Sequence, residues 1–262
     1  MQDTLKFYNR IEKWILEQQK ICNKECLIVG INAPQGAGKT TLTRHLVQAF
    51  RQANLSALQL SIDDFYLTHN EQLKLAQINS QNLYLQQRGY PGTHDIELGI
   101  NIIEKIKSLH GQSMKIPRYD KSAHSGQGDR VPSTQWELLQ GPIKILLFEG
   151  WMLGFSTPKT PPPTSEWKKI DSCLPKYQPW IEALDAFIYL KAENLNYVVD
   201  WRIEAEENMK AQGKSGMSVE KMRAYVDKFI PAYLRYSDTI QQEKLNIPFL
   251  ELTIGKNRLP IK

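Results

Sequence analysis

The chain has 262 residues, of which 41% are hydrophobic and 23% are charged, and its formal net charge is +5. This is a globular composition, and the length favours a single domain over residues 1–262 that carries insertions. The basic residues are scattered without a run of five, which argues against nucleic acid as a partner and favours a small anionic substrate.

Cysteine content and hydropathy favour a cytoplasmic protein. Three cysteines without a Cys-x-x-Cys pair indicate reduced thiols. No stretch approaches the roughly 18 apolar residues of a membrane span, and residues 1–20 lack the apolar core of a signal peptide. Leu5, Tyr8, Ile11 and Ile15 instead fit one face of an N-terminal amphipathic helix over 1–20. We expect a monomer without a membrane partner.

Short apolar runs alternate with helical patterns along the chain. Strands are predicted at 26–31, 55–62, 143–150, 183–192 and 247–254. Helices are predicted at 38–50, 193–212 and 218–242, and around Ile96, Ile100, Ile103 and Ile106. This alternation predicts an α/β protein in which helices flank a parallel five-stranded core sheet in three layers. Residues 65–95 and 110–135 are polar, and the proline-rich segment 154–182 is predicted to be a surface insertion.

The stretch GINAPQGAGKT, residues 30–40, nearly matches the phosphate-binding loop of nucleotide-hydrolysing enzymes, Gly-x-x-x-x-Gly-Lys-Thr/Ser. Ala33 replaces the first glycine, which alanine can do where φ stays negative. The place between a strand and a helix favours a phosphate loop over a glycine-rich turn with an incidental lysine. The residues expected to bind ATP are Gly36, Ala37, Gly38, Lys39, Thr40 and Thr41, with Thr40 also a ligand for Mg²⁺.

Acidic residues stand at the ends of two predicted strands. Asp63 and Asp64 follow 55–62, and Glu149 lies at the end of 143–150. Because the carboxyl ends of parallel strands share one edge of the sheet, these acids should lie near the phosphate loop. One acid of the pair is the candidate base for an attacking hydroxyl, and Asp63 and Glu149 are candidate Mg²⁺ ligands. A helix cap or turn is the alternative for the Asp-Asp pair.

Six blocks, in this order, resemble the plant-type D-glycerate 3-kinases of the phosphoribulokinase/uridine kinase group of P-loop kinases. The blocks are NAPQGAGKTT, SIDDFYLT, RGYPGTHD, PRYDKSAHSGQGDR, FEGWMLGF and WRIEAEENMKAQGKSGMS. The resemblance covers roughly residues 26 to 258. It implies a P-loop NTPase fold and phosphorylation of the 3-hydroxyl of D-glycerate by ATP, giving 3-phospho-D-glycerate and ADP. It further implies that Asp63 is the base, with Asp64 as a helper or second candidate.

The resemblance also implies that insertions within 65–135 bind the acceptor. D-glycerate carries a carboxylate and two hydroxyls, which call for Arg or Lys and for Asp, Tyr or His. The candidates are Asp64, Tyr66, Arg88, His94, Asp95, Arg118, Tyr119, Lys121 and His124. The alternatives are a solvated surface cation, a structural histidine or a packing tyrosine.

Residues 193–217 resemble the lid of P-loop kinases. Arg202 would neutralise charge on the transferred phosphoryl group, and Lys214 would close on ATP. The alternative for Arg202 is a helical charge pair with Glu206, four residues on. In the turn 255–260, Asn257 and Arg258 are candidates for contact with the adenine base, and a surface turn is the alternative.

Two other functions stay open on the residues alone. The first is a related kinase for another small hydroxyl compound, such as a nucleoside, a pantothenate-like acid or a sugar phosphate. The second is a nucleotide-binding regulatory protein that does not catalyse. Lys39, Thr40, Asp63 and Glu149 argue against the second, because a pure binder needs no base.

Overall fold

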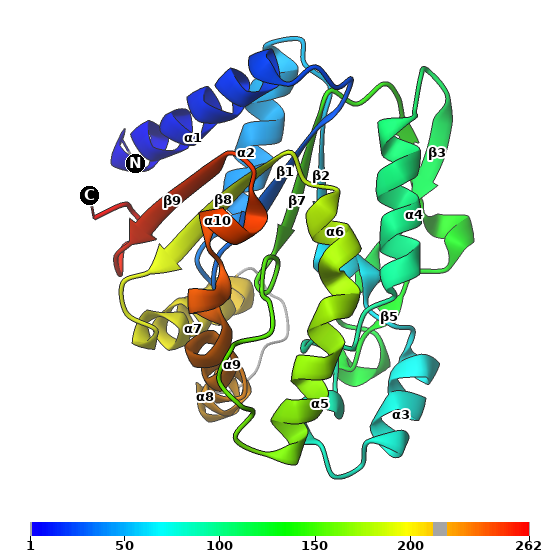
Figure 1. Ribbon diagram of the computed structural model, residues 1–262, viewed down its shortest axis with the longest axis vertical. Coiled ribbons are helices and arrows are strands. Elements are labelled where there is room, and N and C mark those ends of the chain that lie inside the picture. The colour runs from blue at the N-terminus through cyan, green and yellow to red at the C-terminus, as the bar shows by residue number, and fades with distance from the viewer. Residues whose placement is uncertain (1, 212–218, 262) are drawn as a thin grey trace.

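The computed structural model describes residues 2–211 and 219–261, and a parallel β-sheet forms the centre of the fold (Figure 1). The sheet has five strands in the order β2-β7-β1-β8-β9, and every neighbouring pair is parallel. This confirms the predicted α/β class and five-stranded core. The strands are β1 (Leu27–Asn32), β2 (Ala57–Ser61), β7 (Ile145–Gly150), β8 (Ala186–Ala192) and β9 (Phe249–Ile254).

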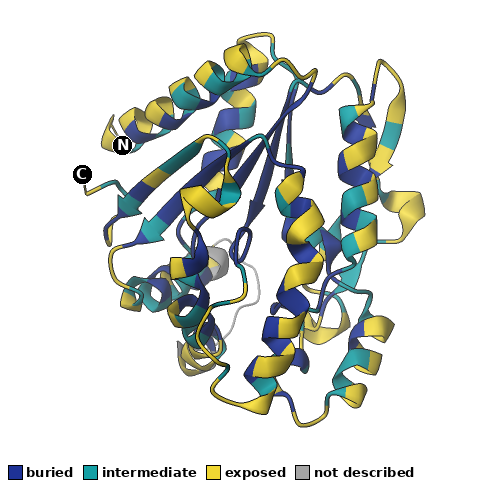
Figure 2. Ribbon diagram, in the orientation of Figure 1, coloured by how far each residue is buried: buried dark blue, intermediate teal, exposed yellow. Residues whose placement is uncertain are grey.

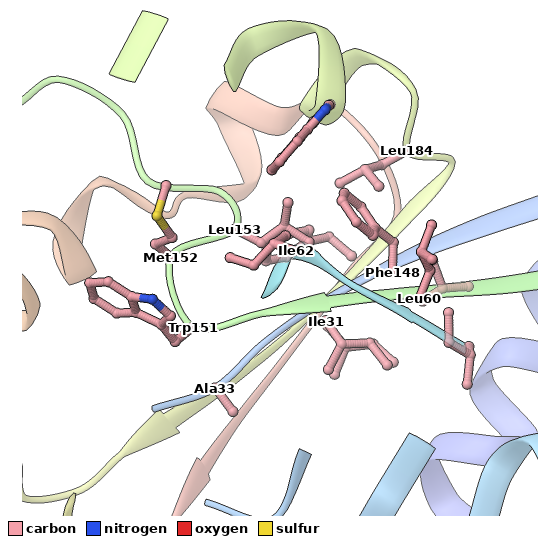
Figure 3. Close-up of a cluster of buried hydrophobic side chains, with 14 of the residues drawn as sticks. Ile31, Ala33, Leu60, Ile62, Phe148, Trp151, Met152, Leu153 and Leu184 are labelled. Carbon is pink, nitrogen blue, oxygen red and sulfur yellow. The ribbon is translucent and has the colours of Figure 1, made fainter. Parts of the chain in front are cut away.

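Helices cover both faces of the sheet, so the central strands are buried and mostly apolar, with Asn32 and Glu149 as the polar residues of β1 and β7. All six residues of β1 and all six of β7 are buried (Figure 2). Ile31, Leu60 and Phe148, from three neighbouring strands, belong to one buried cluster (Figure 3). The helices α1 (Gln2–Ile21) and α2 (Lys39–Gln52) lie on one side of the sheet, and α4 (Ile96–Lys107) and α6 (Gln178–Glu182) lie on the other (Figure 1).

The N-terminal helix forms as predicted, but part of its predicted buried face is wrong. Phe7, Ile11 and Ile15 are the buried residues of α1, whereas Leu5 is 50% exposed. A step of two residues turns a helix by about 200°, so Leu5 and Phe7 point in nearly opposite directions. Spacing by four residues from Phe7 gives the stripe that packs on the sheet.

Small elements fill the long connection between β2 and β7. A single 3₁₀ turn, η1 (Ile62–Phe65), follows β2 directly and leads towards α3 (His69–Ile78). Two short antiparallel pairs follow α4. They join β3 (Ser113–Ile116) to β6 (Glu137–Gln140), and β4 (Tyr119–Asp120) to β5 (Asp129–Arg130).

The prediction of a surface insertion over 154–182 is wrong for its second half. This half forms α5 (Ser165–Cys173) and α6, which bury Trp167, Ile170 and Trp180. The carboxylate of Asp171 accepts hydrogen bonds from Arg235, at 2.5 Å from Nη2, and from the Tyr236 hydroxyl at 2.6 Å. The apolar residues recur at helical spacing and bring the segment into the core, although its proline-rich beginning stays at the surface.

Residues 218–242 are largely helical, as predicted, but they divide into separate helices, because Pro231 lies in the first turn of a new helix, where a missing N–H costs nothing. Within the described residues, no helix is long and apolar enough to cross a membrane. The helices towards the C-terminus are α7 (Asn196–Ala211), α8 (Val219–Asp227), α9 (Ile230–Tyr236) and α10 (Gln242–Leu245).

Candidate active site

The phosphate loop connects the end of β1 to the start of α2. Gly36 has φ 76° and Gly38 has φ 90°, which are left-handed values that favour glycine. A Cβ at Gly36 would lie 2.7 Å from Trp201 Cβ, so this glycine also permits close approach of α7. Ala33 is fully buried and has no positive φ, which explains why alanine fits at this position.

Lys39 points back into this loop. Its Nζ donates to the carbonyl oxygens of Ala33 at 2.8 Å and Pro34 at 3.1 Å. Desolvation lowers the pKa of Lys39, and the nearby carboxylates of Glu149 and Asp63 oppose that shift. Lys39 therefore lies beside both strand-end acids, as predicted. Thr40 and Thr41 are exposed in the first turn of α2.

Asp63 lies in η1, directly after β2. The Ser61 hydroxyl accepts from the Asp63 N–H at 3.2 Å, and Lys121 Nζ lies 2.5 Å from Asp63 Oδ2. Desolvation raises the pKa of Asp63, but the charge and hydrogen bond of Lys121, helped by His94 and Tyr66, outweigh it and hold this pKa at about 2. The carboxylate is therefore ionised at neutral pH and is paired with a cation.

Asp64 has a different set of partners. Its Oδ2 accepts from the Ser61 N–H at 3.1 Å and from Arg118 Nη1 at 3.1 Å, and together with Ser61 it forms the capping box of η1. Arg118 also donates to Glu137 at 2.6 Å. Asp64 and Arg118 thus stabilise the local fold, and Asp63 is the stronger candidate for the base.

Glu149 is the penultimate residue of β7 and lies opposite Ser61 of β2 and Ile31 of β1. Only 5% of Glu149 is exposed; desolvation raises its pKa, and Lys39 opposes the shift. A Cβ at the next residue, Gly150, would lie 2.4 Å from Ile62 Cδ1, so glycine allows η1 to pack against the end of β7. This close packing brings Asp63 and Glu149 to the same edge of the sheet.

His94 is a buried neighbour of Asp63. Its Nδ1 lies 2.7 Å from the Tyr177 hydroxyl, its ring stacks on Tyr66 at 4.4 Å, and its Nε2 has no hydrogen-bond partner among the described residues. Desolvation lowers the pKa of His94 to about 3, although Asp63 opposes the shift, so the imidazole is neutral.

Replacing His94 with phenylalanine is expected to flatten the acid side of the stability profile. The unfolded chain binds a proton at this histidine below pH 6.5, and the folded chain does so only near pH 3. The contribution of His94 to the free energy of unfolding is therefore fully present above pH 6.5. It is lost on acidification towards pH 3, at about 1.4 kcal/mol per pH unit. Urea unfolding at several pH values gives the slope of the unfolding free energy against pH, which should be smaller for His94→Phe than for the wild type and unchanged for exposed His110→Phe. The same slope in His94→Phe and the wild type would contradict a buried neutral His94.

The remaining acceptor candidates separate into two groups. Arg88 lies over the Tyr119 ring at 5.6 Å and donates to the carbonyl oxygens of Gly126, at 2.9 Å, and Gln127, so it orders the loop that carries Lys121. Tyr66, Tyr119 and Lys121 surround Asp63 from that side.

Asp95 and His124 have structural roles instead. Asp95 caps α4 by accepting from the Leu98 N–H at 3.0 Å and pairs with Arg130 at 3.1 Å. His124 stacks on His69 at 3.8 Å and lies 3.1 Å from an oxygen of Asp129. These contacts favour the structural alternative for His124, and they give Asp95 a structural role that the sequence did not indicate.

Arg202 on α7 lies close to the phosphate loop, because its backbone nitrogen would be 3.2 Å from a Cβ at Gly36. Its positive charge contributes to lowering the pKa of Lys39, and its Cζ lies 5.8 Å from the Tyr225 ring centroid on α8. Within the described part of the chain, its buried Nε has no hydrogen-bond partner. Lys214, the second lid candidate, lies outside the described residues.

Sequence reasoning missed two tyrosines at this site. The Tyr233 hydroxyl on α9 accepts from the Gln35 N–H in the phosphate loop at 3.0 Å. The Tyr225 ring on α8 lies 5.8 Å from Arg202 Cζ, within the range of a cation–π contact. A tyrosine in a helix usually packs in a core, so no local signal distinguished these two.

Asn257 is exposed, and its Oδ1 accepts from the Leu259 N–H at 3.1 Å, as in a surface turn. This contact favours the turn alternative over contact with adenine.

A parallel sheet with a glycine-rich loop between β1 and α2, and acidic residues after β2 and in β7, defines a P-loop kinase for small molecules. The chain belongs to the phosphoribulokinase / uridine kinase family, whose family model matches residues 28–158. Both the fold prediction and the family resemblance are thus confirmed.

Several known proteins are similar along most of this chain. It is 39% identical to the chloroplastic D-glycerate 3-kinase of Arabidopsis thaliana over 83% of its own length, but spans only 49% of the plant protein. It is 35% identical to the uncharacterized kinase mug58 of Schizosaccharomyces pombe over 94% of both chains. The solved structure of D-glycerate 3-kinase from Cryptococcus neoformans matches with a TM-score of 0.87, at 31% identity and over 97% of both chains.

Proposed function

We propose that this kinase transfers the γ-phosphoryl group of ATP to the 3-hydroxyl of D-glycerate, giving 3-phospho-D-glycerate and ADP. The observation that carries the proposal is the match over 97% of both chains to a D-glycerate 3-kinase structure. The charges of the site support it, because Lys121 lies beside Asp63 and supplies a cation for the acceptor carboxylate.

In the proposed reaction, the 3-hydroxyl oxygen bonds to the γ-phosphorus as the bond from that phosphorus to the leaving ADP oxygen breaks. Asp63, already ionised, orients the hydroxyl and takes its proton. Lys39 and Arg202 neutralise charge on the transferred group. Lys121 shifts from Asp63 to the acceptor carboxylate, which leaves Asp63 free to act as a base.

The residues fit Mg²⁺ as it occurs in kinases, held by one or two carboxylates and by substrate phosphates. Glu149 is a buried carboxylate beside Lys39, and Thr40 is an exposed residue in the first turn of α2. Among the described residues no group of three acidic, histidine or cysteine side chains could hold a metal alone, which agrees with a site completed by phosphates. When bound, the ion would neutralise phosphate charge.

The proposal extends to the setting of the enzyme. Cys22, Cys26 and Cys173 are all free thiols, which fits a reducing compartment such as the cytoplasm. We propose that the enzyme is a monomer.

A coupled assay for ADP release tests the proposed acceptor. With MgATP, D-glycerate is expected to give ADP at a rate well above that of ATP alone, and L-glycerate, uridine, pantothenate and ribulose 5-phosphate are expected to give little. No release with D-glycerate would reject the proposal. Turnover of another alcohol instead would identify a related kinase, and no turnover with any acceptor would favour a nucleotide-binding regulator.

A further inference from the structure

Arg258 joins the phosphate loop to the helix that carries Arg202. Its Nε donates to the Gly36 carbonyl oxygen at 2.9 Å, and its Nη1 lies 2.8 Å from Glu204 Oε2. Its guanidinium carbon lies 5.7 Å from the ring centroid of Trp201. One planar group therefore contacts the loop and two residues of α7 at once.

The turn that carries Arg258 is firmly held. Arg258 has φ 61°, a left-handed conformation that side chains other than glycine rarely adopt. The Arg258 N–H donates to the Gly255 carbonyl oxygen at 2.9 Å, and the Trp201 indole N–H donates to the Lys256 carbonyl oxygen at 2.7 Å. These bonds fix the direction in which the guanidinium leaves the turn.

The contact at Gly36 extends to Lys39 through the backbone of the loop. The Gly36 carbonyl shares its peptide group with the Ala37 N–H, which donates to the Pro34 carbonyl oxygen at 3.2 Å. The same Pro34 oxygen accepts from Lys39 Nζ at 3.1 Å. Arg258 therefore orients the peptide group whose N–H donates to the same Pro34 oxygen as Lys39, and in this way it acts on the part of the loop that holds Lys39.

We propose that Arg258 is a positioning residue that couples the conformation of the phosphate loop to the placement of α7 and its Arg202. Phosphates bound in the loop and the cation on the lid helix then depend on one guanidinium. Its contacts are with the loop and α7 rather than with the Asp63 side of the site, so it acts on nucleotide binding and not on acceptor recognition. The role rests on the proposed kinase function.

The test compares MgATP binding by Arg258→Ala and by a matched control, using calorimetry without an acceptor. Arg258→Ala is expected to weaken MgATP binding about tenfold, the effect of losing one charge-assisted hydrogen bond. The control is Lys256→Ala, because Lys256 bridges the same turn to α7, at 2.9 Å from Asp200, but lies exposed. It is expected to bind MgATP like the wild type. Arg258→Lys should recover only part of the affinity, because one ammonium cannot serve both Gly36 and Glu204.

Wild-type MgATP affinity in Arg258→Ala would overturn the proposal. An equal loss in Lys256→Ala would also overturn it, because any tether between the turn and α7 would then suffice. Melting temperatures measured without nucleotide distinguish a general loss of folding from weaker binding by folded protein. If unfolded protein accounts for all of the lost affinity, the positioning role is likewise rejected. Since no acceptor is present, these outcomes do not depend on whether D-glycerate is the substrate.

Discussion

Replacing Asp63 with asparagine is expected to lower kcat by on the order of 10²–10⁴-fold, the range typical of a lost general base. Asparagine keeps the shape of the side chain but cannot take the proton of the acceptor hydroxyl. It also removes the charge that holds Lys121 at 2.5 Å. MgATP binding should be retained, because the phosphate loop is unchanged. Steady-state kinetics and calorimetry together check both parts.

Asp64→Asn is the matched control for this variant. Asp64 caps η1 and pairs with Arg118, so Asp64→Asn should lower the melting temperature. Its kcat should fall much less than that of Asp63→Asn. Near wild-type turnover in Asp63→Asn would contradict the assignment of the base. A larger loss of kcat in Asp64→Asn than in Asp63→Asn would move the base to Asp64.

Replacing Lys39 with alanine is expected to weaken both MgATP binding and turnover, with kcat lower by on the order of 10²–10³-fold. Lys39 lies in the phosphate loop between Glu149 and Asp63, where its charge can meet the terminal phosphates. Removing the ammonium also leaves Glu149 as a buried carboxylate without this cation. Initial rates at varied MgATP, together with calorimetry, measure the two losses.

Lys24 offers the control for Lys39→Ala. It is an exposed lysine just before β1, at the opposite end of that strand from the phosphate loop, and it pairs with Asp185 at 2.5 Å. Lys24→Ala should keep wild-type kinetics. Unchanged kinetics in Lys39→Ala itself would remove the phosphate-loop assignment.

The parts of the fold that could be predicted from the sequence are those set by continuous local patterns. β1 and β7 are buried on both faces, and each begins in the sequence as a continuous apolar run, with a polar residue, Asn32 or Glu149, only near its end. The segment 154–182 misled because four of its six prolines come before Trp167 and Ile170, whose helical spacing is the stronger signal, and the other two, Pro175 and Pro179, lie in the first turns of helices. In α1 the prediction failed at Leu5, because this residue is apolar but faces solvent.

The part of the candidate site that could be predicted from the sequence consists of residues located near the ends of strands. Asp63 follows β2, Glu149 lies at the end of β7, and Lys39 follows the loop after β1, so parallel topology brings these three residues to one edge of the sheet. Their partners depend on packing between distant segments, which one sequence does not reveal. Lys121 reaches Asp63 from 58 positions away, and Arg258 reaches Gly36 from 222 positions away.

The position of the phosphate on the product tests the central proposal most directly. D-glycerate, MgATP and the enzyme can be incubated together, and the product examined by coupled ³¹P and ¹H NMR. The proposed reaction gives a phosphorus coupled to the two methylene protons of C3, with one ADP formed for each phosphate transferred. Coupling to the single proton of C2, or the absence of any phosphoester, would contradict it.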